Sequence, residues 1–178
     1  MRARREHVVS AARGWIGTPY RHQGALKGVG CDCLGLIVGV WRELGGKNVG
    51  SIPPYTSDWA EARGRETLAE GFCEHLTEIE PSEARAGDIV LFRWRAHLPA
   101  KHAAILTEEN RMVHAQEGVS VSEVPLNDWW RRRMAYAFSL DRQPSPPCGE
   151  RVAARPLGEA LRDGWGPTPS PSPQGGGE

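Results

Sequence analysis

The chain has 178 residues, of which 39% are apolar, and its 22 lysines and arginines balance its 22 aspartates and glutamates. This neutral balance lacks the basic footprint of a nucleic-acid-binding protein, and no stretch approaches the roughly 18 apolar residues that a membrane-spanning helix needs. Four cysteines are also too few for a disulfide scaffold of this length. The sequence therefore predicts a globular domain with a hydrophobic core, without a nucleic-acid partner and without membrane insertion.

The first part of the chain has the periodicity of helices. Apolar residues recur at helical spacing up to Gly17, and a glycine-rich loop follows. Residues 33–46 are apolar on nearly every side, which predicts a buried helix that ends at a pair of glycines. After a loop over 48–58, residues 59–76 predict a helix with one polar face.

From Ile79 the periodicity changes to that of strands. Turn residues separate five short β-like runs, at 87–94, 101–108, 111–116, 119–124 and 134–141. Residues 125–133, "PLNDWWRRR", predict a short helical or irregular insert. Helices followed by strands within one small domain are typical of the α+β class.

The composition changes sharply near Asp141. Residues 142–178 contain eight prolines and seven glycines among 37 residues, above the level that marks low-complexity sequence. We therefore predict one folded domain over 1–141 and a disordered Pro/Gly-rich tail over 142–178.

The N-terminus carries arginines that resemble the start of a signal peptide. Glu6, His7 and Arg13 interrupt the apolar segment that such a peptide needs, so we expect no signal peptide and synthesis in the cytosol.

The stretch "GVGCDCLGLIVGVW" carries the first candidate chemistry. Structural zinc sites pair two cysteines across two or more residues and need a second pair, which this chain lacks, and a disulfide between Cys31 and Cys33 would be strained. Cys33 instead stands at the start of the buried helix, after Asp32, a favourable N-cap. The N–H groups there favour a thiolate and can hold an oxyanion. A small buried structural cysteine explains this stretch equally well.

A thiol nucleophile requires a base, and two histidines flank a predicted hairpin. If the loop of "KHAAILTEENRMVHAQ" has three residues centred on Glu108, His102 and His114 lie directly opposite each other on one face. One imidazole can then serve as base while the other orients it. The alternative is that both are ordinary strand histidines. His22, close to the cysteine in sequence, competes as a base or contacts substrate, whereas we assign His7, His75 and His97 no chemical role.

These motifs resemble the NlpC/P60 cysteine peptidases, in their phage and gene-transfer-agent tail branch. The resemblance rests on "WIGTPYRHQG…GCDCLGLIVGVW", "ARAGDIVLFRW" and "KHAAILTEENRMVHA", in that order. It implies a papain-like α+β fold in which N-terminal helices pack on a small antiparallel β-sheet. It also implies that Cys33 is the nucleophile, His102 the general base, His114 the group that orients the base, and Tyr20 a substrate or oxyanion contact.

The same resemblance implies hydrolysis of peptidoglycan stem peptides, commonly between D-γ-glutamyl and diaminopimelate or lysine, with no metal or organic cofactor. The chain departs from the common motif in three places: Leu34 replaces serine, His22-Gln23 replaces Trp-Gly, and "HAAIL" replaces "HVGIY". An enzyme of this kind made without a signal peptide needs another route to the wall, so we expect attachment to a phage or gene-transfer-agent tail or baseplate. A thiol amidase or acyltransferase with another substrate, and a non-catalytic tail-assembly component, are the alternatives.

Overall fold

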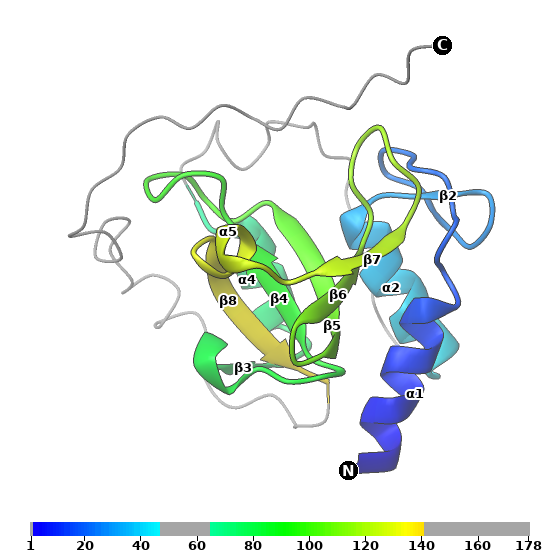
Figure 1. Ribbon diagram of the computed structural model, residues 1–178, viewed down its shortest axis with the longest axis horizontal. Coiled ribbons are helices and arrows are strands. Elements are labelled where there is room, and N and C mark those ends of the chain that lie inside the picture. Colours follow the sequence, from blue (N-terminus) through cyan, green and yellow to red (C-terminus); the bar gives the residue numbers. More distant parts are fainter. Residues whose placement is uncertain (1, 47–64, 141–178) are drawn as a thin grey trace.

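The computed structural model describes residues 2–46 and 65–140, and it has the predicted α+β architecture (Figure 1). The predicted loop over 48–58, the start of the predicted helix over 59–76 and the predicted tail over 142–178 lie outside the described residues. The helices are α1 (Arg2–Arg13), α2 (Cys33–Glu43), α4 (Thr67–Cys73) and α5 (Asp128–Arg131), with a 3-10 turn η1 (Pro81–Glu83).

An antiparallel sheet of six strands, in the order β3-β8-β4-β5-β6-β7, forms the second part of the fold. Its strands are β3 (Thr77–Ile79), β4 (Ile89–Phe92), β5 (His102–Glu108), β6 (Arg111–His114), β7 (Ser122–Pro125) and β8 (Met134–Ser139). All five strands predicted from the sequence are present. The predicted loop between α1 and α2 contains, in addition, a separate two-stranded ribbon of β1 (Ala25–Leu26) and β2 (Gly30–Cys31), and the short strand β3 was also not predicted.

The helices α1 and α2 lie side by side against the sheet, where both contact β5 (Figure 1). Gly39 permits this close packing, since a Cβ atom there would lie 2.1 Å from the ring of Trp15. Alternate residues of β5 divide between two hydrophobic clusters, with Ile105 facing the helices and Leu106 facing the other side, where α5 supplies Trp130. Among the described helices, none has the length and hydropathy that crossing a bilayer requires.

The hairpin of β5 and β6 corrects one prediction. His114 lies opposite Ala104, not opposite His102, and the register shifts by one residue between Leu106 and Glu108. The loop is therefore not the predicted three-residue loop centred on Glu108, because Glu108 is the last residue of β5 and pairs with Arg111. The extra residue forms a β-bulge, which the even spacing of the sequence does not reveal.

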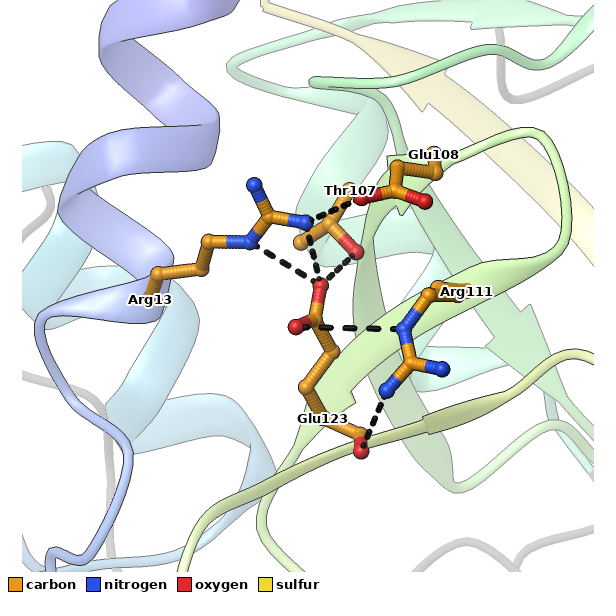
Figure 2. A network of polar contacts seen from close by, with 5 residues as sticks. All are labelled: Arg13, Thr107, Glu108, Arg111 and Glu123. Carbon is orange, nitrogen blue, oxygen red and sulfur yellow. Dashed lines mark hydrogen bonds and ion pairs between the residues drawn. The ribbon is translucent and has the colours of Figure 1, made fainter.

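A polar network fastens α1 to the far edge of the sheet (Figure 2). The guanidinium of Arg13 donates to the Glu123 carboxylate at 2.8 and 3.0 Å and to Glu108 at 2.6 Å, while Thr107 donates to Glu123 at 2.5 Å. Burial opposes ionisation of Glu123, but these hydrogen bonds and the charges of Arg13 and Arg111 outweigh it and lower the pKa of the carboxyl group. The network thereby holds one end of α1 against β5, β6 and β7.

Candidate active site

Cys33 is the first residue of α2, and the predicted N-cap is confirmed. One oxygen of the Asp32 carboxylate accepts the N–H of Gly35 at 2.8 Å, and the other accepts the N–H of Gln23 at 2.7 Å. Asp32 therefore ties the start of the helix to the preceding loop. Gly35 makes this approach sterically feasible, because a Cβ atom there would lie only 1.7 Å from the carbonyl oxygen of Gly24.

The Cys33 thiol lies against the backbone of β5 on both sides of His102. Its Sγ atom donates to the carbonyl oxygen of Lys101 at 3.9 Å, and the N–H of Ala103 points to the sulfur from the other side. Of the two ring nitrogens of His102, Nδ1 is the one closer to that backbone. The helix start thus brings the predicted nucleophile against the backbone that carries the predicted base, and the thiol donates to a carbonyl group and not to an imidazole. Such hydrogen bonds often tighten only when substrate is bound.

The two predicted histidines meet across the hairpin despite the shifted register. His102 Nε2 lies 3.0 Å from His114 Nδ1, and the two rings are nearly perpendicular at 81°. Diagonal neighbours on one face of an antiparallel pair lie within reach of long side chains, which explains how the contact survives a two-residue offset. Both rings are buried, with only 6% of His102 and 3% of His114 exposed. The contact occupies Nε2 of His102, so Nδ1 is the ring nitrogen that remains for another partner.

The histidine contact also fixes where the protons must lie for base catalysis. If Nδ1 of His102 is to accept a proton, the neutral ring must carry its proton on Nε2 and donate it to Nδ1 of His114. Burial lowers the pKa of His102 to about 3, helped by the neighbouring His114, and burial lowers the pKa of His114 to about 4. Both imidazoles are therefore neutral at neutral pH, which is the state that a general base requires.

The pKa of the Cys33 thiol is higher than the sequence predicts. Burial raises its pKa to about 12, the Asp32 carboxylate adds to the rise, and the N–H groups of Ala103, Leu34 and Cys33 itself oppose it. The N–H groups at the helix start thus act in the predicted direction, but burial outweighs them and the pKa of the thiol is raised. The resting site holds a neutral thiol beside a neutral imidazole, so charge separates only when the proton moves.

Tyr20 lies close to Asp32 and Cys33. An isolated parallel bridge joins it to Cys31, with the N–H of Cys31 donating to Pro19 and the N–H of Arg21 donating to Cys31. Burial raises the pKa of Tyr20 to about 12, and the nearby Asp32 and Cys33 add to the rise. The phenol therefore stays protonated and can donate a hydrogen bond near the sulfur. Cys31 itself is fully buried in the core with a free thiol.

The loop between β4 and β5 delivers His102 to this place, and a buried carboxylate holds it. Glu66 is 8% exposed, and its two oxygens accept the guanidinium of Arg93 at 3.0 Å and the N–H of Ala100 at 2.9 Å. Arg93 also donates to the carbonyl oxygen of Ala96 at 3.1 Å and stacks over the ring of Tyr136. Both ends of the loop are thereby fixed to the body of the fold.

Aromatic rings that sequence reasoning did not assign to the site surround the histidines. The centroid of His102 lies 5.5 Å from that of Trp130 and 5.7 Å from that of Trp94, in both cases with planes only 27° apart. Trp130 also meets His114 edge to face at 5.3 Å. The only signal in the sequence was the Trp129-Trp130 pair within the predicted insert, which has no spacing pattern that points to a histidine.

Of the remaining histidines, one lies close to the start of α2 and the others lie away from the candidate site. His22 is exposed, and its Nδ1 lies 3.7 Å from the Asp32 carboxylate, which places it beside the N-cap. His7, His75 and His97 are exposed on α1, after α4 and in the loop between β4 and β5. Within the described ranges, no three histidine, cysteine or acidic residues gather as a metal site would need.

Comparison with known proteins identifies the family. A family model described as the NlpC/P60 family matches residues 17–138, more than half of the chain. The chain belongs to the NlpC/P60 family. It is 26% identical over 140 residues to a gamma-DL-glutamyl hydrolase of Bacillus subtilis, and 26% identical over 121 residues to a probable endopeptidase NlpC of Escherichia coli. These alignments cover 78% and 67% of the chain, but only 30% and 68% of the respective relatives.

Solved NlpC/P60 structures share the fold. The NlpC/P60 domain of the peptidoglycan hydrolase SagA is 27% identical, with a TM-score of 0.52, and the match covers 75% of this chain and 96% of that domain. A Staphylococcus aureus protein described as similar to an NLP/P60 family lipoprotein is 25% identical, with a TM-score of 0.55, over 79% of this chain and 42% of its own. The predicted fold class is thus confirmed by both the sheet and these neighbours.

Proposed function

We propose that this protein is a cysteine peptidase that hydrolyses an amide bond in peptidoglycan stem peptides, of the D-γ-glutamyl–diaminopimelate type. The observation that carries the proposal is the contact of the Cys33 thiol with the backbone on both sides of His102, whose distal nitrogen is bound by His114. In the proposal, Cys33 is the nucleophile, His102 the base and His114 the group that orients the base. The names of the relatives, a gamma-DL-glutamyl hydrolase and a probable endopeptidase, support the choice of substrate.

In the proposed reaction, the proton of the Cys33 thiol moves to Nδ1 of His102 as the sulfur attacks the carbonyl carbon of the scissile amide. The resulting oxyanion accepts hydrogen bonds from N–H groups at the start of α2 and from the Tyr20 hydroxyl. His102 then gives its proton to the leaving amine, the C–N bond breaks, and a thioester remains on Cys33. Water, deprotonated by His102, attacks the thioester and releases the acid and the thiol.

In the resting state both the thiol and the imidazole are neutral, so the proposed proton transfer is unfavourable until the sulfur bonds to the carbonyl carbon. A thiol with a raised pKa and an imidazole with a lowered pKa do not form a stable ion pair before substrate arrives. The imidazolium formed during the attack is stabilised by His114, which accepts the Nε2–H hydrogen bond. The expected consequence is an enzyme whose thiol reacts faster with a bound amide than with a small electrophile in solution.

A digest of peptidoglycan tests the proposal. The full chain and its Cys33→Ala variant are incubated with peptidoglycan that contains diaminopimelate, and released fragments are identified by mass spectrometry. Cys31→Ala is the matched control, because it removes a buried thiol two residues away that has no part in the mechanism. New peptide termini with the parent chain and with Cys31→Ala, but not with Cys33→Ala, are expected. Equal release by Cys33→Ala would refute the mechanism.

We also propose that the enzyme is assembled into the tail or baseplate of a phage or gene-transfer agent, which would carry it to the cell wall. The proposal is supported by the resemblance of its cysteine and histidine motifs to that branch of the family. The test is affinity purification of the tagged chain from producing cells, with identification of the proteins that co-purify. Stoichiometric tail or baseplate proteins are expected, and a chain recovered without them would count against this route.

A further inference from the structure

Three aromatic residues, from β4, from the loop after it and from α5, surround the imidazole of His102. Phe92 ends β4, Trp94 follows it in the loop, and Trp130 comes from α5, and their ring centroids lie 6.1, 5.7 and 5.5 Å from that of His102. The ring centroids of Trp94 and Trp130 are themselves 6.0 Å apart, and those of Phe92 and Trp130 are 4.9 Å apart. The mechanism described above makes no use of these side chains.

Trp130 is distinct within this group because it contacts both histidines. Its plane is tilted by 27° against His102 and by 89° against His114, which matches the 81° between the two imidazoles. One rigid indole therefore sets the orientation of both rings about the hydrogen bond that joins them. Trp94 adds a second wall to His102, and among the described ring contacts it has none with His114.

The position of Trp130 is itself fixed. Its backbone N–H donates to the Asn127 side chain at 3.2 Å, which caps the short helix α5, and its ring meets Phe92 edge to face at 4.9 Å. Only 9% of the residue is exposed. An indole held by a backbone cap and by a neighbouring ring acts as a rigid wall and does not fill space loosely.

We propose that Trp130, assisted by Trp94, is a positioning residue for the His102–His114 pair: it excludes water from the hydrogen bond between Nε2 and Nδ1 and fixes the angle between the rings. His102 then keeps the tautomer that leaves Nδ1 free to accept the thiol proton. The inference rests on the proposed function for its consequence in catalysis, but the geometry of the pair can be measured without any substrate.

Water competes with the hydrogen bond between the two histidines. A hydrogen bond between two neutral imidazoles is of ordinary strength, and water that reached either nitrogen could replace it and release the ring. Two tautomers of His102 would then interconvert, and the one with a proton on Nδ1 cannot act as a base toward Cys33. A face-on indole also stabilises the imidazolium that forms transiently, through the negative face of its π system.

The test compares Trp130→Leu with Trp130→Phe, and uses Trp129→Leu as the matched control. Phenylalanine keeps an aromatic wall, whereas leucine removes it. Trp129 undergoes the same substitution one residue away, and its described ring contacts are with Trp94 and Trp130 and not with either histidine. Thermal unfolding verifies that each variant is folded. If Trp130→Leu does not fold, Trp94→Leu, from the loop between β4 and β5, takes its place.

The first readout is long-range 1H–15N NMR of the histidine side chains, which reports tautomer and exchange with water. In the parent chain and in Trp129→Leu, we expect one tautomer, with the proton of His102 on Nε2 protected from exchange. In Trp130→Leu, we expect mixed tautomers of His102 and exchange of its Nε2 proton with water that is faster by about tenfold or more. In Trp130→Phe, we expect the parental result or one between the two. Unchanged tautomer and exchange in Trp130→Leu, or the same change in Trp129→Leu, would overturn the proposal.

The second readout is kinetic. Trp130→Leu is expected to lower kcat by about tenfold or more with little change in KM, as expected for a misplaced base, while Trp130→Phe stays within about threefold of the parent chain. A change in KM alone would overturn the positioning role. A parent chain that releases no wall peptide at all would refute the proposed function, and the NMR comparison would still decide the inference.

Discussion

The buried histidine pair predicts that the fold loses stability at mildly acidic pH. In the folded protein the pKa of His102 is lowered to about 3 and that of His114 to about 4, chiefly by burial. In the unfolded chain both histidines titrate near the ordinary value of about 6.5. Between these values the unfolded state binds protons that the folded state does not, so stability is complete above about pH 7.5 and falls as the pH decreases through 6.5.

The size of this loss of stability follows from the difference between the folded and unfolded pKa values of each histidine. Between pH 8 and pH 5, protonation of each unfolded-state histidine favours unfolding by about 2 kcal/mol, and the folded state gains almost nothing because both folded pKa values lie below 5. The pair together therefore lowers the free energy of unfolding by about 4 kcal/mol. That is a large fraction of the roughly 5–15 kcal/mol that holds a typical domain folded.

Urea denaturation at pH 8 and pH 5 measures this loss directly. The His114→Gln variant, compared with itself at the two pH values, should lose about half as much stability as the parent chain, because one titrating group has been removed. His97→Gln, at an exposed histidine in the loop between β4 and β5, is the control and should retain the full loss. Equal free energies of unfolding at pH 8 and pH 5, or a loss that His114→Gln leaves unchanged, would refute the argument from burial.

Three further outcomes follow from the structure. Because burial raises the pKa of Cys33 to about 12, its alkylation by iodoacetamide should still be accelerating between pH 8 and pH 10, and a plateau at neutral pH would contradict this. Gly35→Ala places a Cβ atom 1.7 Å from the carbonyl oxygen of Gly24, so it should lower the free energy of unfolding in urea by about 3 kcal/mol and lower the activity. Gly71→Ala, with open space around it, should leave stability unchanged or raise it. Arg13→Gln should cost about 1 kcal/mol or less, measured at low salt, and the cost should shrink at 1 M salt if its exposed ion pairs are responsible.

Local patterns predicted the parts of the site that depend on local chemistry. The helix from Cys33 and its cap at Asp32 follow from an aspartate placed before an apolar run, and both are present. The meeting of His102 and His114 was also predicted, since two strand residues of a short hairpin with even separation share a face. Their exact register was not, because the bulge near Thr107 leaves no mark in the hydrophobic pattern.

The parts of the site that the sequence did not predict depend on contacts between segments that are distant in the chain. Trp130 lies 28 residues from His102 in the sequence, and nothing in its own neighbourhood specifies which ring it touches. The direction of the pKa shift at Cys33 is a further case, since the N–H groups of Leu34 and Cys33 belong to the helix start, whereas the burial and the N–H of Ala103 come from the rest of the fold. The spacing of residues in the sequence indicates which N–H groups lie at a helix start, but it does not indicate how deeply the fold buries the thiol.

The strands are synthesised in an order that differs from their order in the sheet. The thiol of Cys33 and its backbone partner at Lys101 are separated by 68 residues, so the proposed nucleophile is synthesised long before the proposed base. β8 is the last described strand, yet it lies inside the sheet, between β3 and β4. A nascent chain that has not reached Ser139 therefore leaves two strand edges unpaired and the sheet open. Assembly of the thiol–histidine pair is thus coupled to completion of the domain, and a prematurely terminated chain is expected to be a substrate for proteolytic quality control and not a stray hydrolase.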